Sequence, residues 1–185
     1  MVRKLRMGMI GGGRNAFIGA VHRIAANIDG LIELTCGALS SNEENAKLSG
    51  KDLLIADNRI YTNYAEMITQ ESQLPVDVRM DFVSIVTPNH LHFEPAMMAL
   101  EHGFNVVIDK PLSFDYAQAI ALQKKVLETG LLVAVTHTYS GYPMIKQAKQ
   151  MIAEGAFGKI RKVYVEYPQG WLSSFVESSG SKQAA

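Results

Sequence analysis

The sequence has little of several features that would narrow its class. Among 185 residues there is one cysteine, Cys36; it lies in an apolar run, and we interpret it as a packing residue in a reducing compartment. The formal net charge is +0, which gives no reason to expect nucleic acid or an acidic membrane surface as a partner. No apolar run approaches the roughly 20 residues of a membrane span, and nothing near the N-terminus resembles a signal peptide. We therefore expect a soluble, cytoplasmic protein.

Short apolar runs alternate with segments of helical spacing through most of the chain. Strands are predicted at 5–10, 31–39, 81–86, 105–108 and 131–135, with a minimal strand at 60–61, and helices at 15–28, 42–48, 63–72, 91–102 and 115–129. Such alternation is typical of a parallel sheet covered by helices on both faces. The predicted fold class is α/β, with a doubly wound parallel sheet over residues 1–140.

The pattern changes after Pro143. Residues 144–154 have helical spacing, and 159–167 alternate apolar and polar side chains, with Ile160, Val163 and Val165 on one side. Such alternation predicts a strand with one buried face. We expect residues 141–185 to form a connecting helix and the first strand of a second, α+β domain that is largely missing from the chain. A strand without its partner layer would either pair with another chain or leave the residues past about 157 poorly ordered. A homo-oligomer is expected.

A glycine-rich turn follows the first predicted strand. Gly11-Gly12-Gly13-Arg14-Asn15-Ala16 fits the pattern G-x-G-x-x-A at the mouth of a helix. There the first glycine makes the turn, Gly13 lets the backbone approach a pyrophosphate, and Ala16 permits close packing of helix on strand, while free N–H groups of the helix bind the anion. The turn predicts a Rossmann-type dinucleotide site formed by Gly11, Gly13, Arg14, Asn15 and Ala16; a plain tight turn is the alternative.

The end of the second predicted strand does not decide between NAD and NADP. A carboxylate there would accept the ribose hydroxyls of NAD, but the strand ends at Leu39-Ser40-Ser41, and Glu33 lies near its other end. We interpret Ser40 as a ribose or phosphate contact, with a plain turn serine as the alternative. Arg14 could reach a 2′-phosphate. The expected cofactor is therefore NAD or NADP.

Polar residues also follow the third and fourth predicted strands, in Thr87–His92 and Asp109-Lys110-Pro111. Carboxyl ends of parallel strands face the ligand crevice, so we expect Gly11, Thr87 and Asp109 at one edge of the sheet. An ammonium at Lys110 can hold a substrate hydroxyl or stabilise the oxygen left by hydride transfer. From the residues alone, a surface lysine at a strand end is an equal alternative.

These features together resemble the Gfo/Idh/MocA oxidoreductase family, which includes glucose-fructose oxidoreductase and inositol dehydrogenase. The resemblance covers nearly the whole chain, through segments 11–23, 87–92, 109–111 and 155–167 in the right order. It implies a Rossmann domain followed by a domain built on a large, mostly antiparallel sheet. It also implies that Lys110 contacts the substrate near the nicotinamide. The residues implied to line the cofactor crevice are Thr87, Pro88, Asn89, His92 and Asp109, the last in place of the family's glutamate.

Two departures from the family pattern leave the activity open. Residues 136–143 stand where the family has an Asn-Arg-Arg-type loop and lack both arginines, and the Gly-Asp-x-Gly-x-His motif, which supplies a catalytic histidine and aspartate, does not occur. His137 is a candidate substitute base. We expect an NAD(P)-dependent dehydrogenase that transfers a hydride between nicotinamide and a hydroxyl-bearing carbon of a sugar, polyol or related small molecule. The alternative is a dinucleotide-binding module or pseudoenzyme without turnover. No metal, nucleic-acid or membrane partner is expected.

Overall fold

The computed structural model describes residues 3–168, 170 and 173, which fall into two compact units, 1–136 and 137–185. The first unit holds a five-stranded sheet in the order β2-β1-β3-β4-β5 with every neighbouring pair parallel. Its strands are β1 (Leu5–Ile10), β2 (Ile32–Ala38), β3 (Phe82–Ile85), β4 (Asn105–Ile108) and β5 (Val133–Val135). The predicted α/β fold with a Rossmann-type parallel sheet is confirmed.

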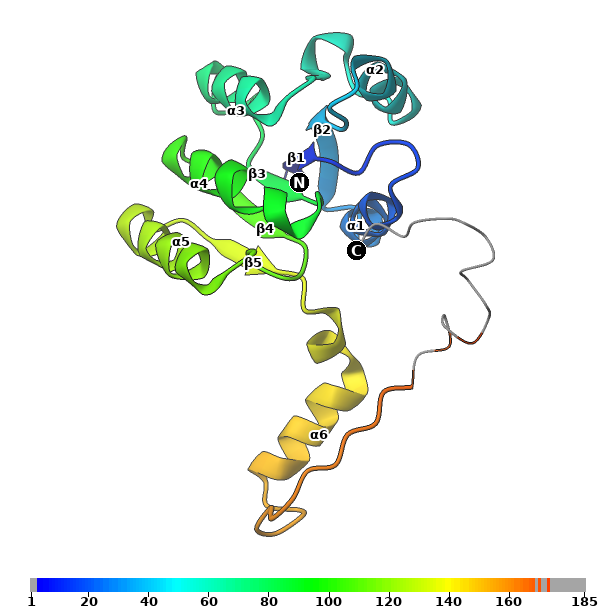
Figure 1. The fold of residues 1–185 in the computed structure, drawn as a ribbon, viewed down its shortest axis with the longest axis vertical. Coiled ribbons are helices and arrows are strands. Elements are labelled where there is room, and N and C mark those ends of the chain that lie inside the picture. The colour runs from blue at the N-terminus through cyan, green and yellow to red at the C-terminus, as the bar shows by residue number, and fades with distance from the viewer. Residues whose placement is uncertain (1–2, 169, 171–172, 174–185) are drawn as a thin grey trace. The chain divides into compact units, whose positions relative to one another are not determined.

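Helices cover the sheet from both sides. They are α1 (Phe17–Asn27), α2 (Glu43–Asp52), α3 (Tyr64–Gln73), α4 (Phe93–Glu101) and α5 (Tyr116–Thr129), with short 3-10 turns η1 (Asp57–Arg59) and η2 (Asn89–Leu91). Figure 1 shows α3, α4 and α5 along one face of the sheet and α1 on the other. The larger core cluster lies under α3, α4 and α5, and a smaller one packs Met7, Met9 and Val86 against Ile18 and Ala26 of α1. Burial on both faces explains why the strands are nearly continuous apolar runs.

The sheet brings three chain segments to one edge. Ile10 at the end of β1 is in register with Ile85 at the end of β3, and Ile85 with Ile108 at the end of β4. The residues that follow these strands, Gly11, Thr87 and Asp109, therefore lie at the same carboxyl edge, as predicted. The order of the strands reverses beside β1, and such a switch point is where open α/β sheets bind ligands.

The second unit differs from its prediction in one respect. Its described part has a 3-10 turn η3 (Thr138–Gly141) and helix α6 (Pro143–Ala153), which confirms the predicted helix. The predicted strand at 159–167 is wrong, because these residues have no regular secondary structure. Alternation alone does not make a strand: the backbone N–H and C=O groups need a neighbouring ladder, and the described residues of this unit supply none. The homo-oligomer expected from that strand stays a prediction without this support.

Two further outcomes concern smaller features of the chain. The minimal strand predicted at 60–61 is an isolated parallel bridge between Ile60 and Gly37. Among the described residues, no helix has the length and apolar character needed to cross a membrane.

Candidate functional site

The glycine turn runs from β1 to α1 and lies against the end of β2. The N–H of Gly11 donates to the carbonyl of Ala38 at 2.9 Å, and that of Gly13 to Leu39 at 3.1 Å. A Cβ at Gly13 would lie 2.7 Å from the Leu39 carbonyl oxygen and 2.9 Å from Ser49 Oγ. Gly13 is therefore needed for the loop to pack against the end of β2. This packing requires a glycine in addition to the predicted approach of a pyrophosphate.

The closest approach of α1 to the glycine turn lies at Gly19, and the packing role predicted for Ala16 stays a prediction. A Cβ at Gly19 would overlap the Cα of Gly12, and one at Gly12 would lie 2.9 Å from the Cα of Gly19. Ala16 directly precedes α1, which begins at Phe17, and its N–H donates to the carbonyl of Gly13 at 3.0 Å. A glycine inside a helix costs about 0.5–1 kcal/mol of stability relative to alanine. A glycine at position 19 of the predicted helix therefore indicates a close contact there, which we did not predict.

The N-terminus of α1 is open to an anion. Its N-cap residue is Ala16, which makes no side-chain cap hydrogen bond, and its first turn has no acidic residue. By contrast, the side chains of Asn42, Asn63 and Asp115 cap α2, α3 and α5. The first N–H groups of a helix have no acceptor within the helix, and the helix dipole makes this end positive. The loop and α1 together therefore fit the pyrophosphate of a dinucleotide.

Arg14, predicted to reach a 2′-phosphate, is already paired. Its Nε and Nη2 donate to the two carboxylate oxygens of Asp52 at 2.6 and 2.8 Å. This pairing raises the pKa of Arg14 and lowers that of Asp52. The backbone N–H of Arg14 donates to Ser49 Oγ at 2.9 Å. Both the backbone and the side chain of Arg14 are thus held by α2.

Ser40 follows β2 at the same edge of the sheet and is half-buried. Its Oγ accepts from the backbone N–H of Asn42 at 3.1 Å and from Nδ2 of Asn45 at 3.3 Å. These contacts orient the hydroxyl as part of the turn into α2, and its contact with a ribose stays a prediction.

His92 joins two of the segments at the carboxyl edge. We predicted that it lines the crevice, but the structure buries it, with 1% of its surface exposed. Its Nε2 lies 2.7 Å from the carbonyl oxygen of Thr87, and its Nδ1 lies 2.8 Å from that of Pro111. The burial follows from its place at the start of α4, directly over the core. His92 therefore positions the Thr87 and Lys110 segments, while Pro88 and Asn89 remain at least partly exposed.

A second set of polar side chains supports Asp109 and was not foreseen. His22 in α1 places Nδ1 2.9 Å from Ser84 Oγ and Nε2 3.4 Å from Asp109 Oδ1. Thr136 Oγ1, after β5, donates to the same oxygen of Asp109 at 2.7 Å. His22 comes three residues after Gly19 and so shares its helix face; this spacing is the signal that could have found it.

Comparison with known proteins places the chain in a family. The model of the family described as "Oxidoreductase family, NAD-binding Rossmann fold" (GFO_IDH_MocA) matches residues 5–137. The chain belongs to the Gfo/Idh/MocA oxidoreductase family. It is 36% identical over 173 residues to an uncharacterised oxidoreductase, YfiI, of Bacillus subtilis, covering 93% of this chain and 44% of the relative. It is 28% identical over 170 residues to levoglucosan dehydrogenase of Pseudarthrobacter phenanthrenivorans, covering 92% of this chain and 42% of that enzyme.

Solved structures of oxidoreductases are also similar to this chain. An oxidoreductase from Sinorhizobium meliloti matches with a TM-score of 0.81 and 44% identity, over 86% of this chain and 44% of that one. An inositol dehydrogenase homologue from Azotobacter vinelandii, complexed with NADH and myo-inositol, matches with a TM-score of 0.88 and 37% identity, over 97% of this chain and 47% of that one. The chain therefore spans less than half the length of these Gfo/Idh/MocA relatives.

Within this family member, Lys110 is exposed at the carboxyl edge, directly after the half-buried Asp109. His22 and Thr136 hold the Asp109 carboxylate from two sides, so the backbone that carries Lys110 is fixed. His137 lies in the second unit, and its part as a base stays a prediction.

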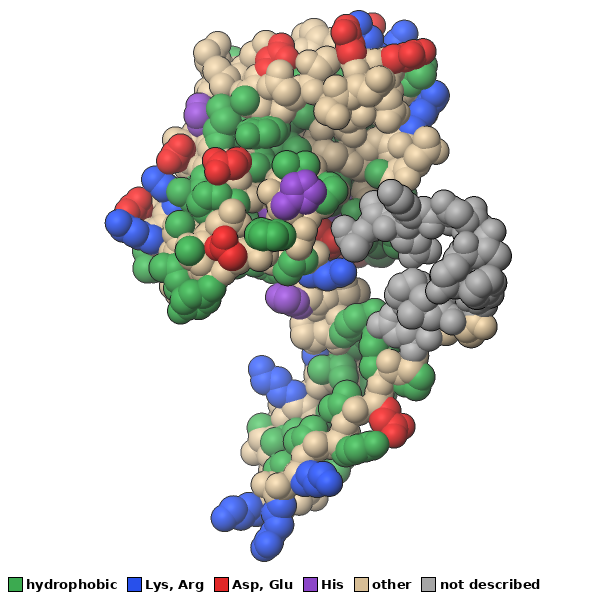
Figure 2. Space-filling view, viewed as in Figure 1, with side chains coloured by type: hydrophobic (Ala, Val, Ile, Leu, Met, Phe, Trp, Pro, Cys, Tyr) green, Lys and Arg blue, Asp and Glu red, His purple; other side chains and the backbone are tan. Residues whose placement is uncertain are grey.

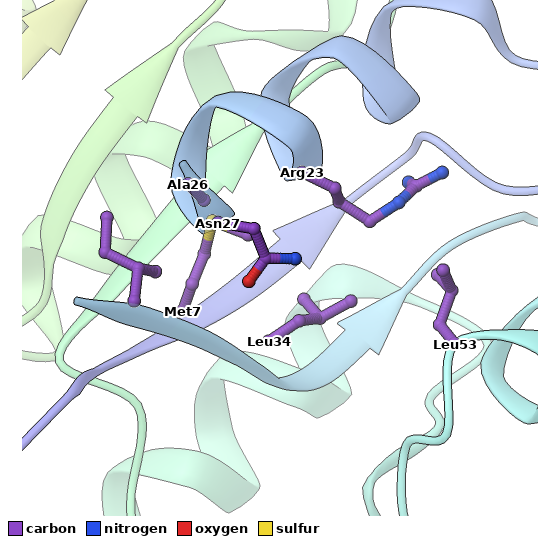
Figure 3. Close-up of a pocket in the computed structure, with 7 residues that line it drawn as sticks. Met7, Arg23, Ala26, Asn27, Leu34 and Leu53 are labelled. Carbon is purple, nitrogen blue, oxygen red and sulfur yellow. The ribbon is translucent and has the colours of Figure 1, made fainter. Parts of the chain in front are cut away.

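Two hollows have Arg23 in their lining. One, of about 230 Å³, is lined by the loop, Ala20, Arg23 and the end of α2. The other, of about 150 Å³, lies between α1, β1 and β2 and is lined by Met7, Arg23, Ala26, Asn27, Ile32, Leu34 and Leu53 (Figure 3). Arg23 Nη1 donates to the carbonyl of Gly12 at 2.7 Å, and burial lowers its pKa. Both hollows are smaller than the roughly 300 Å³ of a usual ligand pocket. Arg23 lines both of them and holds the carbonyl of Gly12.

Proposed function

We propose that this chain is the cofactor-binding half of an NAD(P)-dependent oxidoreductase that transfers a hydride between nicotinamide and a hydroxyl-bearing carbon of a sugar, polyol or related small molecule. The observation that carries the proposal is the uncapped N-terminus of α1, set behind a glycine loop at the same sheet edge as Lys110. The named activities of its relatives support it, since they include a levoglucosan dehydrogenase and an inositol dehydrogenase homologue bound to NADH and myo-inositol.

The residues of the glycine loop would bind the pyrophosphate. The first turn of α1 donates N–H groups to the anion, and Gly11 and Gly13 keep the loop free of side chains. Ser40 would contact the adenosine ribose at the end of β2. The segments held together by His92 would line the crevice through Thr87, Pro88, Asn89 and Asp109. When bound, the nicotinamide supplies the hydride or receives it.

Lys110 would act on the substrate oxygen. Its ammonium donates a hydrogen bond to the hydroxyl and stabilises the negative charge that develops as the proton leaves. Asp109, held by His22 and Thr136, keeps this lysine at the strand end. A base must accept the hydroxyl proton; His137 is a candidate substitute for the catalytic histidine of the family.

The test is a pair of measurements on the full chain. Calorimetric titration with NADH and NADPH measures cofactor binding, and absorbance of the reduced nicotinamide measures turnover with NAD or NADP and a panel of polyols and sugars. Binding together with turnover supports the proposal. Binding without turnover favours the alternative of a dinucleotide-binding module, and no binding of either dinucleotide contradicts both.

A further inference from the structure

One arginine lies where a site for NADP would use one. In Rossmann folds the adenosine ribose sits at the end of the second strand, where a carboxylate accepts the hydroxyls of NAD or an arginine accommodates the 2′-phosphate of NADP. Arg14 directly follows Gly13, whose N–H donates to Leu39 just after β2 at 3.1 Å. The backbone of Arg14 is therefore close enough to this strand end for its side chain to serve a phosphate there.

The structure turns that side chain the other way. Two guanidinium nitrogens of Arg14 donate to the two carboxylate oxygens of Asp52, the last residue of α2, at 2.6 and 2.8 Å. This parallel, two-bond arrangement is the strong geometry for an arginine and a carboxylate. The hydroxyl of Ser49, earlier in the same helix, accepts a hydrogen bond from the backbone N–H of Arg14 at 2.9 Å. The backbone of Arg14 is therefore also held against α2.

The side chains that contact Ser40 would bind a phosphate only weakly. Asn42 and Asn45, which donate to Ser40, are neutral. The nearby cation Lys47 already pairs with Glu43 at 2.6 Å. Figure 2 shows acidic and basic side chains next to one another over α2. A 2′-phosphate would therefore compete with a carboxylate for Arg14 and for Lys47, while Lys51 lies in the last turn of α2, at the other end of this helix from Ser40.

We propose that Asp52 is a specificity-determining residue: by engaging Arg14, it makes the site prefer NAD(H) to NADP(H). A dianionic 2′-phosphate at Ser40 would find the arginine of the glycine loop already paired with a carboxylate. The inference rests on the proposed dinucleotide site and deepens it. The side chains of Arg14 and Asp52 are 43% and 51% exposed, so water and salt screen the pair. The preference is therefore graded rather than absolute.

The test is calorimetric titration of the full chain with NADH and with NADPH. The wild type should bind NADH about tenfold more tightly than NADPH, the scale of one charge-assisted contact. Asp52→Asn keeps the shape of the side chain and removes its charge, so Arg14 is free to contact the 2′-phosphate. This variant should bind NADPH about five- to tenfold more tightly than the wild type, the scale of one gained charge-assisted contact, and NADH within about twofold. Adding Arg14→Ala to Asp52→Asn should abolish the gain.

A matched control separates a specific effect from general charge. Glu44→Gln removes another exposed carboxylate of α2 and should leave the affinity for NADPH unchanged. An equal gain in Glu44→Gln would overturn the inference, as would a gain that survives in the double variant or an Asp52→Asn variant without a gain. Circular dichroism and urea unfolding like those of the wild type show that each variant is folded. A wild type that binds both dinucleotides equally refutes the preference alone, whereas one that binds neither contradicts the proposed function as well.

Discussion

Nε2 of His22 lies 3.4 Å from Oδ1 of Asp109, which joins helix α1 to the end of strand β4. The other ring nitrogen lies 2.9 Å from the hydroxyl of Ser84 in β3. One side chain thus links the helix that begins at the glycine loop to the strand end that carries Lys110. The two halves of the candidate site, which are about ninety residues apart in sequence, are held together inside the first unit.

The first prediction concerns the stability that this link provides. His22→Ala leaves the buried Ser84 hydroxyl and the half-buried Asp109 with one partner fewer. An unsatisfied buried polar group costs about 1–3 kcal/mol, so the free energy of unfolding in urea should fall by about that amount. The control is His102→Ala, which removes a single contact of 2.8 Å to the Met98 carbonyl at the end of α4. Equal losses in the two variants would show that the His22 link stabilises the protein no more than the single contact of His102 does.

The second prediction concerns the glycine loop. Gly13→Asp should abolish binding of NADH, because its Cβ would meet the Leu39 carbonyl at 2.7 Å and its charge would oppose the pyrophosphate. Gly141→Asp is the matched control, because a Cβ there has nothing within 4 Å. Calorimetry should show loss in the first variant and normal binding in the second. Normal NADH affinity of the Gly13→Asp variant would show that the glycine loop does not bind the dinucleotide.

The fold could be predicted because the patterns that indicate it lie within short stretches of the sequence. Apolar runs alternating with helical spacing predict a covered parallel sheet without any long-range information, and that sheet alone brings Gly11, Thr87 and Asp109 to one edge. The spacing places Gly19 and His22 on one face of α1, but the contacts of both depend on which segments this helix crosses, and spacing does not give that. The pairing of Arg14 with Asp52 joins residues 38 apart, on two elements. The strand predicted at 159–167 failed for the opposite reason: its local pattern was right, but a strand also needs a partner.

The third prediction concerns acid sensitivity of the first unit. Asp81 accepts from Arg3 at 2.7 and 2.8 Å and from the backbone N–H of Arg6 at 2.8 Å. The hydrogen bonds from the Arg3 side chain have the largest effect, and those from Arg6 add to it. Together they hold the pKa of Asp81 well below its usual range. In the unfolded chain the pKa is about 3.9. The stabilisation is therefore complete above this value and is lost as the pH falls toward the lower pKa of the folded state.

Asp81→Asn should make the unit less stable near neutral pH, and the difference from the wild type should shrink as the pH falls below about 4. Urea unfolding at several pH values measures both effects. Asp77→Asn is the control, since Asp77 is exposed and lies shortly before β3. A deficit of Asp81→Asn that stays constant down to pH of about 2 would mean that the charge of Asp81 contributes nothing.

The last prediction concerns Lys110 and is measured in a chain that shows turnover. Lys110→Ala removes the ammonium that the proposed mechanism places on the substrate oxygen. Loss of one donor to developing charge lowers the rate by about 10²-fold or more, so kcat should fall by at least that factor. The affinity for NADH should change little, because the pyrophosphate is assigned to the glycine loop and α1, at the end of a different strand. Lys124→Ala, at an exposed position in α5, should leave both values unchanged. Near-normal turnover of Lys110→Ala would make this residue a surface lysine at a strand end, the alternative that its place in the sequence also allows.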